Sequence, residues 1–293
     1  MAHEDRRLVF IAQDAPFEQL RRELPAQHIH EGINEAHCVG MATALALDGF
    51  IPYIFGTASF VVRRCYEQLL LDACLHNAPV RVIGAAAGSF YAHWGPTHVC
   101  LDDVSLMRCL PGMSVCAPSC AEEVASLLPQ YHERPGPHYL RLTMGKQHCA
   151  DFHTVPPQFG KAYPVRQGKD VMLITCGALL QPAHDAVQSA RACGVDAGLL
   201  HMGTLIPFDT ETLLEQTRSA RTIITVEDHF VTGGLGSMVA EVLAEAGALS
   251  GKRFKRLGAP VGFLDNYGSQ AEHLAHYGLD VRGIADAINT LNA

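Results

Sequence analysis

Short apolar segments alternate along the chain with longer segments in which apolar residues recur at every third or fourth position. The short segments predict strands, and those of the first half span residues 8–12, 51–55, 80–85, 114–117 and 138–142. The longer segments predict helices over residues 31–47, 64–76 and 121–132. Strands that alternate with helices favour an α/β fold with a mostly parallel sheet.

The same alternation returns after an irregular stretch, residues 145–168, which contains a Pro-Pro pair. It predicts strands over residues 170–175, 196–201 and 222–226 and helices over residues 180–193, 209–218, 237–246 and 281–291. A chain of 293 residues is long enough for about two domains. We therefore expect two doubly wound α/β domains with mostly parallel sheets, at residues 1–150 and 165–293.

Composition and charge narrow the class of protein. Hydrophobic residues make up 48% of the chain and charged residues 18%, and the net charge is −8. No apolar run reaches the ~18 residues of a membrane helix, and no basic stripe indicates a nucleic-acid surface. The N-terminal residues show no signal-peptide pattern, so we expect a cytoplasmic protein without membrane or nucleic-acid partners. The ten cysteines form no CxxC pair and are expected to be reduced and structural.

The helix predicted over residues 31–47 contains, near its start, the string Gly-Ile-Asn-Glu at residues 32–35. Its Glu35 could simply be a first-turn carboxylate that complements the helix dipole. However, the residues that follow are mostly small and apolar. A carboxyl group in an apolar pocket can share a proton with a weakly basic ring nitrogen, which makes Glu35 a candidate catalytic residue.

Two further candidate strings follow predicted strands. Thr57 and Phe60 come after the strand over residues 51–55, and Trp94 begins the string Trp-Gly-Pro-Thr-His that ends at His98. Taken alone, Phe60 is explained by core packing and His98 by an ordinary loop position. An imidazole in such a loop can also donate a hydrogen bond to a developing alkoxide or carry a proton, so His98 is a second catalytic candidate.

Together these strings resemble the motifs of the transketolase family of thiamine-diphosphate enzymes, in the family's order and spacing. The resemblance implies that Glu35 hydrogen-bonds the aminopyrimidine of thiamine diphosphate and that Phe60 and Thr57 line the cofactor ring. It implies that His98 faces the thiazolium and the substrate carbonyl. Arg64, in the segment after Phe60, is expected to hold the helix or the subunit interface. The resemblance covers almost the whole chain, because residues 226–237 match the family's C-terminal domain.

One family element is missing from this sequence. The family's diphosphate-binding domain carries a Gly-Asp-Gly string that helps to hold magnesium, and this string is absent. The resemblance therefore implies the C-terminal subunit of a split transketolase that holds no metal itself. An N-terminal partner subunit would supply the diphosphate site and Mg²⁺, and an α2β2 heterotetramer with self-dimer contacts is expected.

The substrate side departs from the family pattern. Trp94 replaces an aspartate that contacts a donor hydroxyl, and Gln27 stands where an arginine near the donor phosphate is expected. Ala86 falls near the position of a family histidine, whereas Arg141, a phosphate contact in the family, is kept. Losing one charge-assisted phosphate contact costs roughly 1.5–3 kcal/mol. We therefore expect His98, Trp94 and Arg141 to meet a small-molecule substrate that is unphosphorylated, smaller or more apolar than a pentose phosphate.

Several alternatives stay open. The beta subunit of a 2-oxo-acid dehydrogenase shares both domains and the Gly-Ile-x-Glu string but lacks the Gly-Pro-Thr-His loop. A deoxyxylulose-phosphate-synthase-like half enzyme shares that loop. A regulatory subunit would keep the fold without catalysis, although the retention of Glu35 and His98 argues against it. The Gly-rich turn at residues 233–236 matches no nucleotide-binding spacing, and we interpret it as a tight turn into a packed helix.

Overall fold

The computed structural model describes residues 2–13, 17–132, 134–143, 152, 156–264 and 267–292. The first half of the chain contributes strands β1 (Leu8–Ala12), β2 (His28–His30), β3 (Ile51–Thr57), β4 (Arg81–Ala85), β5 (Ser114–Cys116) and β6 (His138–Arg141). Its helices are α1 (Glu18–Glu23), α2 (Glu35–Leu47), α3 (Ala58–Arg63), α4 (Tyr66–Gln68), α5 (Asp103–Met107) and α6 (Ala121–His132), with a π-helical turn η1 (Leu69–Cys74) and a 3-10 turn η2 (Ala92–Trp94).

The second half contributes strands β7 (Tyr163–Arg166), β8 (Val171–Thr175), β9 (Ala197–His201), β10 (Thr204–Ile206), β11 (Thr222–Phe230) and β12 (Arg253–Ala259). Its helices are α7 (Leu180–Ala192), α8 (Thr210–Thr217), α9 (Leu235–Glu245), α10 (Gln270–His276) and α11 (Val281–Asn292), and a 3-10 turn, η3 (Gly177–Leu179), precedes α7.

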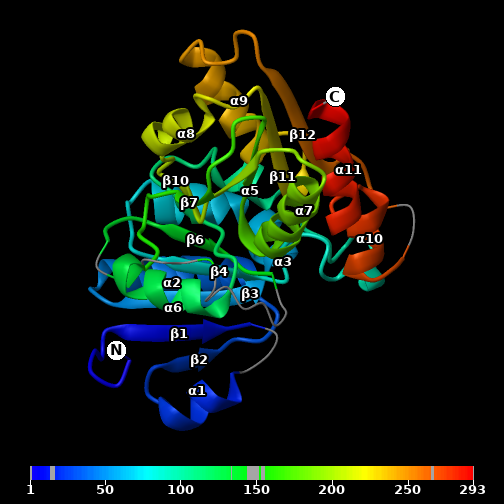
Figure 1. Cartoon of the computed structure of the whole chain (residues 1–293). Helices are drawn as coiled ribbons and strands as arrows, with labels where there is room; N and C mark the ends of the chain where they lie inside the picture. Colours follow the sequence, from blue (N-terminus) through cyan, green and yellow to red (C-terminus); the bar gives the residue numbers. More distant parts are fainter. Residues whose placement is uncertain are drawn as a thin grey trace.

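These elements form two sheets with helices packed on their faces (Figure 1). The strand order is β10-β5-β6-β4-β3-β1-β2 in the first sheet and β12-β11-β8-β9-β7 in the second. Neighbouring strands are parallel, apart from β10 on β5 and β7 on β9, which are antiparallel edge pairs. Central strands such as β8 are buried along their whole length, as expected of a parallel sheet covered on both faces. The predicted fold class is confirmed.

Strand β10 belongs to the second half of the sequence but completes the edge of the first sheet. Thr204 lies opposite Cys116, and Ile206 lies opposite Val115. The boundary that the sequence predicts, within residues 145–168, falls partly outside the described residues. The two halves of the sequence therefore do not correspond one-to-one with the two sheets.

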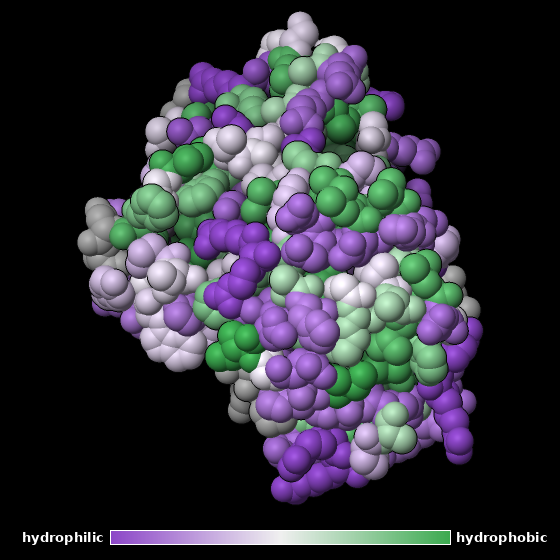
Figure 2. Space-filling model, turned by 180° about the vertical axis from the view of Figure 1, so that it is seen from behind, coloured by the Kyte–Doolittle hydropathy of each residue, from purple (hydrophilic) through white to green (hydrophobic). Residues whose placement is uncertain are grey.

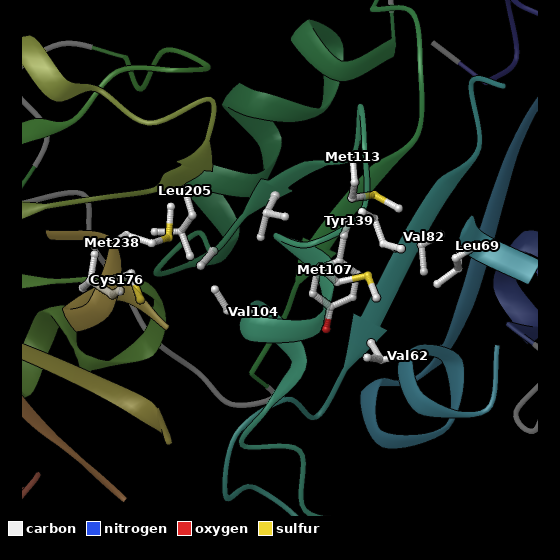
Figure 3. Close-up of a cluster of buried hydrophobic side chains, with 14 of the residues drawn as sticks. Val62, Leu69, Val82, Val104, Met107, Met113, Tyr139, Cys176, Leu205 and Met238 are labelled. Carbon is white, nitrogen blue, oxygen red and sulfur yellow. The ribbon is translucent and has the colours of Figure 1, made fainter. Parts of the chain in front are cut away.

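The largest buried apolar cluster also joins the two halves of the chain (Figure 3). Val82, Met107 and Tyr139 come from the first half, whereas Leu205 and Met238 come from the second, and all are buried. Close-packed interiors tolerate few voids. A substitution that changes side-chain volume in this cluster would therefore disturb the packing of both domains.

The helix predicted over residues 64–76 is placed and shaped differently in the structure. It begins six residues earlier, with α3 following directly from β3, and continues through α4 into the π-helical turn η1. In the last part the backbone N–H of Leu75 donates to the carbonyl of Leu70, an i→i+5 bond. The helix predicted from residue 31 instead starts at Glu35, so Glu35 occupies the first helical position.

A buried polar network ties the domains together. Arg141 donates from Nε to Oδ2 of Asp103 at 2.9 Å and from Nη2 to the backbone carbonyl of Asp228 at 2.7 Å. The Tyr139 hydroxyl donates to the same Asp103 oxygen at 2.8 Å. Burial acts to lower the pKa of Arg141, but attraction to the Asp103 and Asp228 carboxylates outweighs burial and raises it. This pairing keeps a buried charge satisfied.

The Gly-rich turn at residues 233–236 is occupied by a carboxylate of the protein itself. The backbone N–H groups of Leu235 and Gly236 donate to the two carboxylate oxygens of Glu227 at 2.7 and 2.8 Å. A Cβ atom at Gly234 would collide with that carboxylate, so only glycine allows this approach. The interpretation as a tight turn into a packed helix is confirmed.

Among the described residues, cysteine chemistry departs from expectation at Cys120. Eight of the cysteines are free thiols, six of them buried, whereas Cys120 is disulfide-bonded. The expectation that all ten are reduced is therefore wrong at Cys120, which the CxxC criterion could not detect because it tests only close spacing. In the described part of the chain, none of the helices is both long and apolar enough to cross a bilayer.

His138 on β6 makes the fold sensitive to acid. Its side chain is buried between the rings of Tyr131 and Phe159, and burial, aided by the charge of Arg81, lowers its pKa to about 3. The unfolded chain binds this proton near the usual histidine pKa of about 6.5, whereas the folded chain does not. Stability should therefore fall as the pH drops below that value.

We expect His138→Phe to remove this penalty. Its free energy of unfolding relative to wild type should rise by about 1.4 kcal/mol per pH unit as the pH falls from about 6 to 4, measured by urea unfolding at each pH. His276→Phe, at an exposed position, is the matched control and should not change the pH slope. Equal slopes for His138→Phe and wild type would contradict a neutral, buried His138.

Candidate active site

The candidate residues lie where the parallel strands of the first sheet end. Glu35 begins α2, which follows β2, Thr57 is the last residue of β3, and His98 lies in the loop after β4. Strands β2, β1, β3 and β4 are consecutive in the sheet, so these ends meet at one edge. In open parallel sheets this carboxyl edge is where ligands bind.

Glu35 is held in place by a cation that the sequence did not assign to the site. Its side chain is 4% exposed, and Arg64 donates from Nη1 to its Oε2 at 2.7 Å. The guanidinium of Arg64 also lies 4.5 Å from the centre of the Phe60 ring, a cation–π distance. Arg64 was expected to hold the helix or an interface, but the structure places it between Glu35 and Phe60.

His98 stands between two aromatic side chains. Its ring centre lies 5.1 Å from that of Phe60 and 4.9 Å from that of Trp94, with an edge-on geometry in both pairs. The Thr97 hydroxyl is 2.9 Å from Nδ1, while Nε2 has no hydrogen-bond partner among the described residues. A line of contacts thus runs from Glu35 through Arg64, Phe60 and His98 to Trp94.

Two buried polar groups beside this line lack partners. Gln13, directly after β1, and Ser59, the second residue of α3, are 2% and 3% exposed. Within the described residues, Nε2 of Gln13 and Oγ of Ser59 have no hydrogen-bond partner, although buried polar groups usually do. These groups and Glu35 fit a flat ligand with polar ring atoms. Ser59 stands inside the string of residues 57–60, where no role was assigned to it, whereas no string marked Gln13, because only the fold brings it to this edge.

Thr57 and Phe55 differ in whether they can join the candidate site. Thr57 is half-buried at the start of α3 and its side chain caps no helix N–H, so it is free to face a ligand. Phe55, an aromatic residue two positions before Thr57, packs edge-on against Phe17, with ring centres 4.2 Å apart. It lines an apolar cavity with Tyr53 and Ile83 and does not join Phe60.

Arg141 and Gln27 are both committed to structural contacts. Arg141 is 4% exposed and bonded to Asp103 and Asp228, as described above, which argues against a role in contacting substrate. The Gln27 amide donates to the backbone carbonyls of Asp5 and Leu8 at 3.0 and 2.9 Å. Neither side chain offers a free cation or amide to a substrate phosphate in this arrangement.

The described residues offer no metal centre. Among residues 2–13, 17–132, 134–143, 152, 156–264 and 267–292, no group of three or more His, Cys, Asp or Glu side chains could hold a metal ion. What these residues do bring together is a buried carboxyl, an aromatic ring and an imidazole along one sheet edge.

Comparison with known protein families agrees with the two-part architecture. Residues 1–148 match the family model "Transketolase, pyrimidine binding domain", and residues 160–284 match "Transketolase, C-terminal domain". Glu35, Phe60 and His98 all fall in the first of these matches.

Individual relatives fall into two groups by length. A subunit of the apulose-4-phosphate transketolase of Actinobacillus succinogenes is 32% identical over 285 residues, which is 96% of this chain and 89% of that protein. 1-Deoxy-D-xylulose-5-phosphate synthase of Bordetella parapertussis is 35% identical over 98% of this chain but only 46% of its own length. The chain thus spans nearly all of the transketolase subunit but about half of the synthase.

Solved structures repeat this pattern. A split-gene transketolase, described as an inactive beta4 tetramer, superposes with a TM-score of 0.87 at 27% identity, covering 99% of this chain and 93% of the other. A transketolase of Pichia stipitis superposes at 0.76 and 18% identity, covering 44% of its own chain, and this match supports the fold alone. The chain belongs to the transketolase family and corresponds to the subunit of a split enzyme that carries the pyrimidine-binding and C-terminal domains.

Proposed function

We propose that this chain is half of an enzyme that transfers a two-carbon ketol or acyl unit with thiamine diphosphate. The observation that carries the proposal is the buried Glu35 at the carboxyl edge of the first sheet, in line with Phe60 and His98. Relatives named as transketolase subunits support the class of reaction.

The residues present fit the pyrimidine end of this cofactor. The unpartnered Gln13 and Ser59 offer hydrogen bonds to ring nitrogens or an amino group, and the Phe60 ring offers a stacking face. Glu35 would hydrogen-bond a ring nitrogen and exchange a proton with it, and Arg64 would keep the carboxylate oriented. When bound, the cofactor supplies a nucleophilic carbon and an electron sink, while the protein orients it.

His98 is placed to act on the substrate carbonyl. Its Nδ1 is engaged with Thr97, so Nε2 remains to donate a hydrogen bond to an oxygen that gains negative charge. Trp94 and Phe60 fix the ring from two sides, which limits its rotation. Positioned donors of this kind contribute most when they are held before the reaction starts.

The other half of the site would come from a partner subunit that holds the diphosphate and Mg²⁺. Ile33, two residues before Glu35, is 69% exposed, so apolar surface borders the candidate cofactor site. Leu75 and Phe263 are also exposed, at 73% and 92%. Independently of these residues, Figure 2 shows green, hydrophobic atoms gathered in patches on the back of the molecule. Exposed apolar patches mark interaction surfaces. We propose an α2β2 assembly, in which copies of this chain also contact each other.

The first test measures thiamine-diphosphate binding in the presence of Mg²⁺, with circular dichroism as the method of detection. We expect no binding to this chain alone and binding to an equimolar mixture with its N-terminal partner subunit. The partner alone is the matched control, because it lacks Glu35 and Phe60. Tight binding by this chain alone would contradict the half-site proposal.

A deoxyxylulose-phosphate-synthase-like reaction is the second candidate, favoured by 35% identity over 98% of this chain to such a synthase. The two candidates differ in the donor, a ketose for ketol transfer and a 2-oxo acid such as pyruvate for acyl transfer. Turnover of the reconstituted pair with each donor distinguishes them. Equal or better turnover of a ketose phosphate would contradict the expectation of an unphosphorylated donor.

A further inference from the structure

Aromatic rings continue from His98 toward the surface, and we call the surface formed by Trp94, Tyr91 and Tyr267 the aromatic wall. The Trp94 indole is stacked on the Tyr91 ring, with centres 4.4 Å apart and planes 22° apart. The ring of His93, the residue directly before Trp94 in η2, has its centre 5.2 Å from that of the indole. Trp94 is 53% exposed and Tyr91 is half-buried, so the stack leaves a broad apolar surface open to solvent.

The second domain extends this wall. Gly95 has a φ of +81°, and a Cβ atom at this position would collide with Cε1 of Tyr267. The Tyr267 ring therefore packs directly on the loop that carries Trp94 and His98. Tyr267 is 72% exposed, so it too presents its ring to solvent.

The arginines on this side of the first sheet are already paired. Arg63 donates two hydrogen bonds to the Asp102 carboxylate, from Nε at 2.9 Å and from Nη2 at 2.7 Å, and a third to the Val99 carbonyl. Arg64 is paired with Glu35, and Arg141 is buried with Asp103. A phosphate placed against the aromatic wall would have to break one of these ion pairs to gain a guanidinium partner.

Resting on the proposed function, we infer that Tyr91, Trp94 and Tyr267 form a substrate subsite for a neutral group with a flat apolar face, such as an aromatic ring. The reacting carbonyl lies at His98, and the ring attached to it lies along the Trp94–Tyr91 stack. Trp94 is the main specificity-determining residue, and the C-terminal domain contributes to specificity through Tyr267. Covering roughly 60 Å² of apolar surface on such a wall corresponds to about a tenfold gain in affinity.

Trp94 is the only tryptophan of the chain, so its fluorescence reports directly on this subsite. We would titrate the chain, alone and mixed with its partner subunit, with benzyl alcohol, glycerol and glycerol 3-phosphate. The difference between wild type and Trp94→Phe isolates the Trp94 signal in the mixture. We expect a saturable change with benzyl alcohol, at about tenfold lower concentration than with either glycerol compound.

Variants and substrates complete the test. In calorimetric titrations, Trp94→Asp should weaken benzyl alcohol binding about tenfold, and Trp94→Phe should largely preserve it. Phe50→Ala, a half-exposed aromatic at the opposite end of β3, is the control and should have no effect. In the reconstituted enzyme, Trp94→Asp should lower kcat/KM for benzaldehyde as acceptor relative to glyceraldehyde 3-phosphate.

The outcomes separate this inference from the proposed function. Tighter binding of glycerol 3-phosphate, or no saturable change in Trp94 fluorescence while the mixture binds thiamine diphosphate, would overturn the subsite alone. A mixture that binds no cofactor would overturn the proposed function, while the fluorescence titration would still measure the wall.

Discussion

Glu35→Gln is expected to lower kcat of the reconstituted enzyme by about 10²–10⁴-fold, the range for loss of a positioned proton-transfer group. Glutamine keeps the shape and polarity of the buried side chain but cannot hold a proton for a ring nitrogen. It also removes the charge that pairs with Arg64 at 2.7 Å. Steady-state kinetics with saturating cofactor measures the effect, and circular dichroism shows whether the fold is kept.

Glu31→Gln provides the matched control for this experiment. Glu31 lies four residues before Glu35 and is exposed, and its carboxylate lies 3.9 Å from the imidazole of His37. We expect its kcat to stay within about twofold of wild type, since exposed ion pairs contribute little. Activity of Glu35→Gln equal to that of Glu31→Gln would sink the catalytic role and favour a regulatory subunit.

Arg141→Met is expected to destabilise the protein by about 3–5 kcal/mol, because it leaves the carboxylate of Asp103 buried without its cation. Methionine preserves most of the side-chain volume, so a cavity adds little to this loss. Asp103 is completely buried and would keep only the Tyr139 hydroxyl among these partners. Urea unfolding of the isolated chain measures the change in free energy.

Two further variants identify the cause of that loss. Adding Asp103→Asn to Arg141→Met should recover part of the stability, because it removes the unpaired charge. Arg282→Met, which breaks an exposed contact with Asp286, should change stability by less than about 0.5 kcal/mol. A loss below about 1 kcal/mol for Arg141→Met would show that the buried Arg141–Asp103 pair contributes little to stability.

The parts of the candidate site that the sequence could indicate are those that short strings encode. Glu35, Phe60 and His98 each stand in a local string that follows a strand, His98 at the far end of a longer loop, and parallel topology then brings the strand ends together at one edge. Gln13 could not be predicted in this way, because its role depends on β1 lying between β2 and β3. The Arg64–Glu35 contact likewise depends on how two helices pack.

The elements that the sequence missed are short or carry charges. Strand β12 reads Arg-Phe-Lys-Arg-Leu-Gly-Ala, a pattern that looks like a surface loop but is tolerated at a sheet edge. Helices α1 and α5 have six and five residues, too few to show a helical period. Strands β7 and β10 each pair with the edge strand of a sheet. Their strand conformation therefore depends on the assembled sheet and not on their own sequence pattern.

The position of β10 affects the order in which the protein can form during synthesis. The first sheet ends at β5 until residues 204–206 have left the ribosome, so a nascent first domain exposes the unpaired backbone of β5. Open strand edges pair readily with other chains. A chain interrupted before this point would present that edge permanently, so an N-terminal fragment should aggregate where the full chain does not.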